Sequence, residues 1–512
     1  MAFDLQELAS THDAICRGQW FDIDELLAAA DDPAPETKAW TLAFRAAQAL
    51  TRGGVDLPQL AEVEALPLEV PGVARAVARI CDHAVLGALA AFDLPLLRRW
   101  ATLAPNEEFV PSELTALRLA FAAGDHASVR ALQPELQAHH QLEAACLKAL
   151  VDVASGQRDD AREAARWASR HARMLQARPH RFVASLVLAR TRRCDGRSHL
   201  ASRIADSIQP VLPAAFRGWL RWEQLLCGEW GPAGDHQASS SLRAMLEAAL
   251  QGQRDLFETH RGSLLEIANA TPFLAPEIHA LTALIDPDCS AMSDPVRAFV
   301  EGESHEVPFG LTNPTPRSEH SSRTTSYVLH RPGRSPRRVL LCGAALAPNA
   351  TPLPLTRLRK GRLDLACAVI ALAREPLSEE TLFRACHGFR FARHLHEGAL
   401  SMLVSRVRER FEGHVEVHRK GGQVWLHGAG AFLVPDPRSV VPIEQSLLAL
   451  IARTGSTTTR VAARSLGVSL RSVQSAVATL VKEGELAMDR SGRSIGYRVD
   501  DTSFSDLTPL AG

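Results

Sequence analysis

The sequence predicts a mainly α-helical protein in which a long helical region is followed by two small α/β modules. Over residues 1–300 alanine and leucine recur at helical spacing, and strand-like alternation of apolar and polar residues is rare. Residues 301–325 are rich in Ser, Thr, Pro and charged residues, which is typical of a linker. Short β-like runs then alternate with helical segments over residues 326–437 and again over residues 438–500, and residues 501–512 are predicted to be a tail.

A chain of 512 residues is too long for one hydrophobic core. Its nine cysteines are scattered and never occur in Cys-x-x-Cys spacing, which favours reduced thiols over disulfides or a zinc framework. The N-terminus lacks the basic and apolar regions of a secretory signal, and no apolar run reaches the roughly 18 residues that a membrane span needs. We therefore expect a cytoplasmic protein with no membrane partner.

The net charge of −1 conceals an uneven distribution. Residues 317–498 contain 28 Lys and Arg against 14 Asp and Glu, whereas the rest of the chain contains 29 against 44. A basic segment in a near-neutral protein points to an anionic partner for that segment alone. Arginine supplies nearly all of this charge, and the whole chain is rich in Ala, Arg and Leu, so a GC-rich genome is an alternative explanation.

Three turns are predicted at a spacing of 32 residues in the helical region. They lie at residues 91–93 (Ala-Phe-Asp), 123–125 (Ala-Gly-Asp) and 155–157 (Ser-Gly-Gln). Around the third turn, small residues stand where two antiparallel helices would approach closely: Ala145, Ala149, Ala161, Ala165 and Ala168. This unit resembles a tetratricopeptide repeat (TPR), whose period is about 34 residues. The resemblance implies a TPR-like α-solenoid that binds a protein or peptide partner, and the alternative is an irregular helical domain.

The first basic module, residues 326–437, begins with two β-like runs, TSYVLH and RRVLLCG. Leu355 and Thr356 then precede an apolar helix, LDLACAVIALA. Ser378 is predicted to be the N-cap of a second helix, because Glu379 and Glu380 in the next turn favour the helix dipole.

A third helix is predicted over residues 397–411, and a hairpin with a basic tip follows it. The buried stripe of this helix comprises Leu400, Val404, Val407 and Phe411. Ser401, Ser405 and Arg408 share the opposite face, and Arg406 lies at its flank. The hairpin turns at Arg419-Lys420-Gly421-Gly422.

Residues 337–436 resemble the effector domain of OmpR/PhoB-class response regulators. The resemblance lies in the order of their segments, which is β-runs, PLT, a helix, REPLS, SMLVSRVRERF and a hairpin that ends in FLVPD. The resemblance implies a winged helix whose third helix enters the major groove and whose wing contacts the minor groove. It places Arg406 and Arg408 at recurrent basic positions of that helix and Arg419 or Lys420 in the wing.

The module departs from this family in several ways. The spacing between PLT and REPLS is longer than usual, and Leu403 stands where the family often has a polar DNA-contacting residue. No receiver domain precedes the module, and the related activators that carry TPR repeats have the opposite domain order. One alternative is a degenerate winged helix used for dimerisation or protein contact. A separate alternative for Arg406 and Arg408, taken singly, is that they are surface salt-bridge partners of Glu409 and Glu412.

The second basic module, residues 438–500, contains a clearer pattern. One helix is predicted for the segment IEQSLLALIAR. Two more are predicted for TTTRVAARSLGVSLRSVQSAVATLVKEG, with a turn between them at Gly467 and Ser469 as the N-cap of the second. In the last helix Val473, Val477, Leu480 and Val481 are expected to face inward, which leaves Arg471, Ser472, Gln474, Ser475 and Lys482 for solvent or DNA. A strand, a turn with Arg490 and Arg493 near its tip, and a second strand complete the module.

This order resembles the winged helix-turn-helix of DeoR-like bacterial repressors. The resemblance implies DNA contacts from Arg471, Ser472, Gln474 and Ser475 and from the wing residues Arg490 and Arg493. An ordinary helix with a solvated face is the alternative. A homodimer on a palindromic site is the usual solution for such modules.

Motifs that would indicate an enzyme are missing from the sequence. It contains no GK[ST] phosphate loop, no GxGxxG after a strand, no HExxH and no GxSxG. Cys386, His387, His394 and His396 match no zinc spacing, and His139 and His140 are expected to be exposed. We therefore predict a DNA-binding transcriptional regulator without catalytic residues, metal or cofactor. A protein-binding scaffold is the alternative, and double-stranded DNA, with a protein or peptide on the solenoid, is the expected partner.

Overall fold

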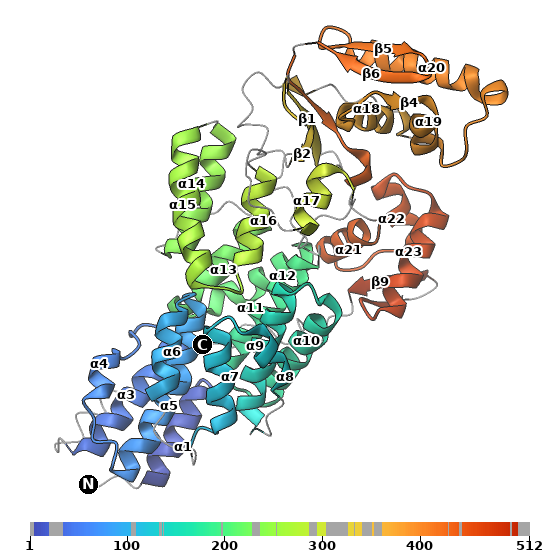
Figure 1. Ribbon diagram of the computed structural model, residues 1–512. Helices are drawn as coiled ribbons and strands as arrows, with labels where there is room; N and C mark the ends of the chain where they lie inside the picture. Colours follow the sequence, from blue (N-terminus) through green and yellow to red (C-terminus); the bar gives the residue numbers. More distant parts are fainter. Residues whose placement is uncertain are drawn as a thin grey trace. The chain divides into compact units, whose positions relative to one another are not determined.

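The computed structural model shows a mainly helical protein with a few small, mostly antiparallel sheets (Figure 1). The chain divides into two compact units, one formed by Met1–Leu242, Ser263–Pro276 and Leu447–Gly512 and the other by Arg243–Gly262 and Glu277–Ser446. The structure describes residues 5–19, 34–103, 109–132, 136, 138–195, 198–227, 236–251, 253–285, 294–303, 326–331, 333–339, 351–352, 361–428, 430–439, 443–491 and 494–499.

Helices make up the described part of the chain before residue 304. They are α1 (Leu5–Cys16), α3 (Pro35–Thr51), α4 (Leu60–Glu64), α5 (Pro71–Ala90), α6 (Leu94–Leu103), α7 (Ser112–Ala122), α8 (His126–Ala131), α9 (Ala138–Ala154), α10 (Arg158–Met174), α11 (Arg178–Cys194), α12 (Ser198–Ile208), α13 (Ala214–Leu226), α14 (Gln237–Gln251), α15 (Arg254–Ala270), α16 (Ala275–Ile285) and α17 (Asp294–Glu301). No helix in the described ranges is both long and apolar enough to cross a membrane.

The three predicted turns lie where the sequence places them, between α5 and α6, α7 and α8, and α9 and α10. Phe92, Gly124 and Gly156 each adopt a positive φ in these turns. Glycine reaches this conformation without strain, whereas a side chain as at Phe92 adopts it at some cost. The three turns therefore share one backbone geometry although their sequences differ.

Small side chains let α10 pack closely against its neighbours. Ala161, Ala165, Ala168 and Ala172 recur every three or four residues and are buried, while Asp159 and Asp160 in the first turn favour the helix dipole. Ala149 of α9 is likewise buried. Trp219 and Trp222 of α13 are also buried.

A buried arginine joins three helices in the first unit. Arg118 of α7 donates from Nε and Nη2 to Glu143 of α9 at 2.7 and 2.6 Å, and from Nη2 to Asp82 of α5 at 2.8 Å. Arg118 is fully buried, and Glu143 and Asp82 are nearly so. Three charges removed from water must remain together, because each would be strongly destabilising alone.

In the described part of residues 326–439, the second unit contains two small sheets and three α-helices. One sheet has the order β2 (Arg337–Val339), β1 (Tyr327–His330), β7 (Phe432–Pro435), β3 (Thr351–Pro352), and the other has the order β4 (Leu377–Ser378), β6 (Gln423–His427), β5 (Glu416–Lys420). Helices α18 (Arg362–Leu372), α19 (Glu379–His387) and α20 (Arg393–Phe411) lie between these strands in sequence. Leu355 and Thr356 lie outside the described residues.

Several local predictions for this region are confirmed. The Ser378 hydroxyl accepts a hydrogen bond from the Thr381 N–H at 3.1 Å and so caps α19. The predicted stripe of α20, which comprises Leu400, Val404, Val407 and Phe411, is buried in one core with Val328 and Phe432. The hairpin β5–β6 turns at Gly421 and Gly422, which both have positive φ.

The C-terminal elements are α21 (Ile443–Thr454), α22 (Thr459–Leu466), α23 (Leu470–Lys482), β8 (Leu486–Ser491) and β9 (Ser494–Val499). The two strands form an antiparallel pair. Glu485, just before β8, is buried and accepts from Arg166 of α10 at 2.9 Å and from Arg192 of α11 at 2.8 Å, all within the first unit.

Replacing the buried cation should cost far more than replacing an exposed one. We expect Arg118→Met to lower the free energy of unfolding by about 3–5 kcal/mol, because Glu143 and Asp82 remain buried without their partner. Arg130→Met is the matched control, since Arg130 of α8 pairs with Asp152 at 2.8 Å while 37% of its side chain is exposed. Its cost should be about 1 kcal/mol or less. Urea unfolding followed by circular dichroism measures both, and equal costs would contradict the role given to Arg118.

Candidate functional site

Four of the side chains predicted to contact DNA in the second basic module share one exposed face of α23. Arg471, Ser472, Gln474 and Ser475 are exposed. Val473, Ala476, Val477 and Leu480, on the opposite side, are buried, whereas Val481 is only half-buried. The expected division of the helix into two faces is therefore present.

The start of α23 is fixed by its own sequence. Gly467 adopts a φ of 64° at the end of α22, and Ser469 accepts a hydrogen bond from the Ser472 N–H at 3.1 Å. The glycine permits the left-handed turn and the serine cap begins the next helix two residues later. As a result, the short polar residues occupy the first two turns of α23.

The predicted basic tip of the C-terminal hairpin is only partly described. Arg490 belongs to β8, and Arg493 lies outside the described residues. Both remain predictions as DNA contacts.

In the first basic module the predicted side chains differ in their surroundings. Ser405, Arg406 and Lys420 are exposed on α20 and β5. Arg408 is also exposed, and its Nε donates to the Val417 carbonyl of β5 at 3.0 Å. Leu403, which stands at a family DNA-contact position, is buried.

Arg419 is occupied by partners within the module. It donates to Glu379 of α19 at 2.7 Å, to Glu397 of α20 at 2.6 Å and to the Ser401 hydroxyl at 2.7 Å. The hydrogen bonds that Arg419 donates to Glu379 and Glu397 raise its pKa. Arg419 and Ser401 therefore join the hairpin to two helices, a role that the sequence pattern does not reveal.

A second candidate site lies in the N-terminal helices. A pocket of about 360 Å³ is lined by side chains from α1, α5, α9 and α11, including His12, Cys16, Arg79, His83, His139 and His180. Four imidazoles and a thiol in one pocket supply five soft or borderline metal-binding groups. The sequence pattern did not predict this pocket.

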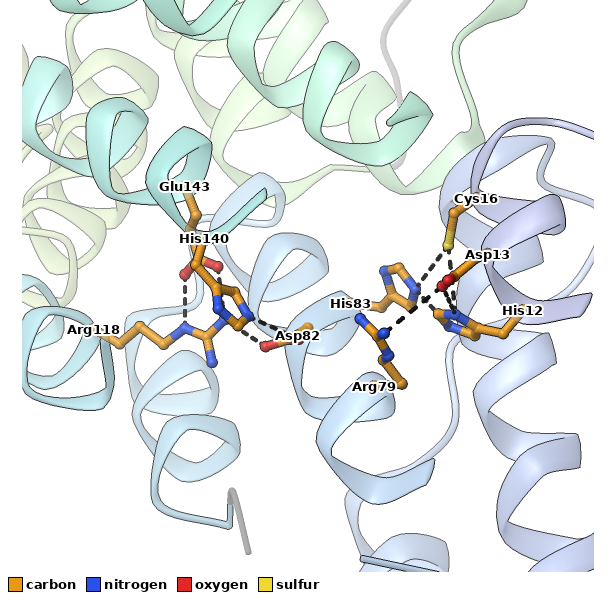
Figure 2. A network of polar contacts seen from close by, with 9 residues as sticks. All are labelled: His12, Asp13, Cys16, Arg79, Asp82, His83, Arg118, His140 and Glu143. Carbon is orange, nitrogen blue, oxygen red and sulfur yellow. Dashed lines mark hydrogen bonds and ion pairs between the residues drawn. The ribbon is translucent and has the colours of Figure 1, made fainter. Parts of the chain in front are cut away.

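The closest group in this pocket is formed by His12, Cys16 and His83. Figure 2 shows His12 and Cys16 on one helix, with their side chains facing His83 on another. The His12 and His83 Nε2 atoms are 3.1 Å apart, and Cys16 Sγ lies 3.5 Å from His83 Nε2 and 3.8 Å from His12 Nδ1. His12 and His83 are almost completely buried.

The two facing imidazoles have different proton affinities. Burial, together with the charge on His12, holds the pKa of His83 well below its usual range. Burial also disfavours the cation of His12, but the neighbouring Cys16 sulfur and hydrogen bonds to Asp13 and Cys16 outweigh it and raise the pKa to about 9. The hydrogen bond with His12 lowers the pKa of Asp13. His83 therefore presents a neutral ring to its neighbours.

A second group of polar side chains, next to this pocket, surrounds the buried Arg118 and includes Asp82 and His140. His140 Nε2 lies 3.3 Å from Asp82 Oδ2 (Figure 2). Burial opposes ionisation of Asp82, but Arg118 and His140 hold its pKa well below the usual range. The expectation that His139 and His140 are exposed was wrong: His140 is 2% exposed and His139 lines the pocket. Their helix packs these rings against α5 and α11, which the helical pattern alone did not indicate.

Histidines and a cysteine near residue 390 have a packing role. Phe383 stacks on His387 and His396 with ring centroids 4.1 and 4.9 Å apart, and Cys386 of the same helix is buried. These contacts form an aromatic cluster at one end of α19 and α20.

Comparison with known proteins gives no relative: no family model matches the chain, and no curated protein or solved structure matches it.

The two neighbouring basic residues of the hairpin should behave differently. We expect Arg419→Ala to destabilise the β5–β6 hairpin by about 1–3 kcal/mol, because two carboxylates lose a hydrogen-bonded cation. Lys420→Ala should leave the hairpin unchanged, since Lys420 is exposed. Hydrogen exchange of peptides from β5 and β6 measures this as a fall in protection for the first variant alone. Equal protection in both variants would show that Arg419 is dispensable for the hairpin.

Stability should fall on mild acidification because of the pocket histidines. Burial, with a further contribution from a neighbouring histidine, lowers the pKa of His139 and of His180 to about 4, against 6.5 in the unfolded chain. Between these values the unfolded chain binds more protons, so the melting temperature should drop as the pH falls from about 6.5 to about 4. Calorimetry should show a flatter profile for the double variant His139→Gln, His180→Gln than for the wild type. An unchanged profile in the double variant would contradict this assignment.

Proposed function

We propose that this protein is a sequence-specific DNA-binding transcriptional regulator whose TPR-like N-terminal helical region binds a protein or peptide partner. The observation that carries the proposal is the exposed face of α23, where Arg471, Ser472, Gln474 and Ser475 stand together above a buried apolar face. In a winged helix-turn-helix, such residues at the start of the second helix contact base edges in the major groove.

The local chemistry of α22 and α23 supports this use. Arginine donates to guanine, glutamine pairs with adenine, and serine hydroxyls bind either bases or phosphates. The turn at Gly467 and the cap at Ser469 present these side chains from the first two turns of α23. The β8–β9 hairpin follows α23 directly, in the position where a wing is expected.

The charge of the C-terminal third also supports a polyanionic partner. Residues 317–498 carry a surplus of basic over acidic residues, while the rest of the chain is acidic. Cations near DNA release condensed counterions, and this favours binding at low salt. The element order of residues 326–437 is consistent with the OmpR/PhoB-type winged helix, in which Ser405, Arg406 and Lys420 are the exposed candidates.

A second candidate function is a protein-binding scaffold. The ion pairs of Arg419 with Glu379 and Glu397 favour it, because this predicted wing cation is neutralised within the module. In that case the first module would serve in dimerisation or protein contact. The two functions differ in whether the full chain binds DNA at all.

The test is DNA binding by the full chain, measured by fluorescence anisotropy on sites selected from genomic fragments. We expect salt-sensitive binding, and Arg471→Ala should weaken binding to the selected site by about 1–3 kcal/mol and reduce discrimination against altered sites. Arg98→Ala is the matched control, because Arg98 is an exposed arginine on α6 that should not contact DNA. Absence of salt-sensitive binding would reject the regulator and leave the scaffold. Equal effects of both variants would reject the assignment of α23.

A further inference from the structure

We propose that His12, Cys16 and His83 bind one divalent transition metal ion, and that zinc fits this ligand set best. Two imidazole nitrogens and a cysteine sulfur are the donors that zinc and its neighbours in the first transition series prefer. Helix α1 supplies His12 and Cys16 one turn apart, and α5 supplies His83 from the facing side. The inference is independent of the proposed DNA binding.

The distances agree with a shared ion. Zinc–nitrogen bonds of about 2.0–2.1 Å at tetrahedral angles place two nitrogens about 3.3 Å apart, and a zinc–sulfur bond of about 2.3 Å places sulfur about 3.6 Å from nitrogen. The observed separations are 3.1 Å between the two Nε2 atoms and 3.5 Å between Cys16 Sγ and His83 Nε2. With one ligand atom from each residue, all three donors lie within 4.8 Å of one another, so they can surround one ion after a small adjustment.

The buried rings of His12 and His83 also require a proton or a cation between their facing nitrogen atoms. Within the described part of the chain, His83 Nδ1 has no hydrogen-bond partner, so Nε2 is the nitrogen through which this buried ring interacts. Two nitrogen atoms 3.1 Å apart repel each other unless a proton or a cation lies between them. A metal ion satisfies both nitrogens and the sulfur at once, whereas a single proton satisfies one pair.

The surroundings resemble those of known metal sites in two respects. Asp13 Oδ1 lies 3.5 Å from His12 Nδ1, so a carboxylate faces the ring nitrogen that remains when Nε2 binds the metal. Three protein ligands leave one tetrahedral position, and the adjoining pocket of about 360 Å³ provides space there for water or a small ligand. A site of this kind binds an exchangeable ligand more readily than a closed structural site does.

The experiment uses the full chain, stripped with a chelator and titrated with zinc against a chromophoric competitor. We expect one tight ion per chain, and Cys16→Ser and His83→Gln should each weaken it more than tenfold. Cobalt(II) should give a thiolate-to-metal charge-transfer band in the wild type that Cys16→Ser lacks. Cys227→Ser, at the end of α13, and His171→Gln, on α10, are matched controls that should retain both affinity and band.

Two results would overturn the proposal. One is a wild-type chain without the thiolate band, and the other is a band that survives in Cys16→Ser. If the variants fail to fold, X-ray absorption of the zinc-loaded wild type decides the question without them. It should show one sulfur at about 2.3 Å and two nitrogens at about 2.0–2.1 Å, and a shell of nitrogen and oxygen alone would reject the site.

Discussion

The arrangement of the N-terminal helices depends on the ion triad of Arg118, Glu143 and Asp82. Arg118 is fully buried and bonds to a carboxylate on each of two other helices, so none of the three can move away without leaving a charge unpaired. This condition fixes the rotation of α5 about its own axis. Successive residues of a helix are about 100° apart, so an Asp82 held toward α7 and α9 directs His83 away from them, toward α1 (Figure 2). The pocket therefore owes its geometry to a charge network of which Asp82 also lines the pocket.

The same dense packing explains why the histidines of the pocket differ in pKa. Burial disfavours the charged ring at His83, His139 and His180, and nearby histidines add to this effect. His12 differs because Asp13 and Cys16 lie beside it. Metal ions bind deprotonated ligands, so a metal ion at this site would compete with the proton on His12. The pH dependence of stability and the proton affinities of the pocket histidines thus follow from one arrangement of helices.

Local features could be predicted from the sequence, and long-range ones could not. The three turns, the caps at Ser378 and Ser469 and the buried stripe of α20 follow from neighbouring residues, and the structure has them where they were predicted. His12 and His83 are separated by 71 positions, and Arg118 and Asp82 by 36, so their contacts depend on which helices become neighbours. Helical periodicity shows that a face is buried but not what it is buried against. For this reason the exposure of His140 was misjudged and the pocket was missed.

The basic charge of the C-terminal third likewise has to be judged by the contacts of each residue as well as by composition. Its surplus of arginine is a property of the sequence, but the structure gives Arg338, Arg419 and Arg438 carboxylate partners within the second unit. A cation that already faces a carboxylate releases fewer counterions when DNA approaches, so it contributes little to the salt dependence of binding. Exposed cations such as Arg406, Lys420 and Arg471 remain effective. A DNA-binding role would therefore depend on cations of this kind, and in the proposed function Arg471 is the one that reads a base as well as a phosphate.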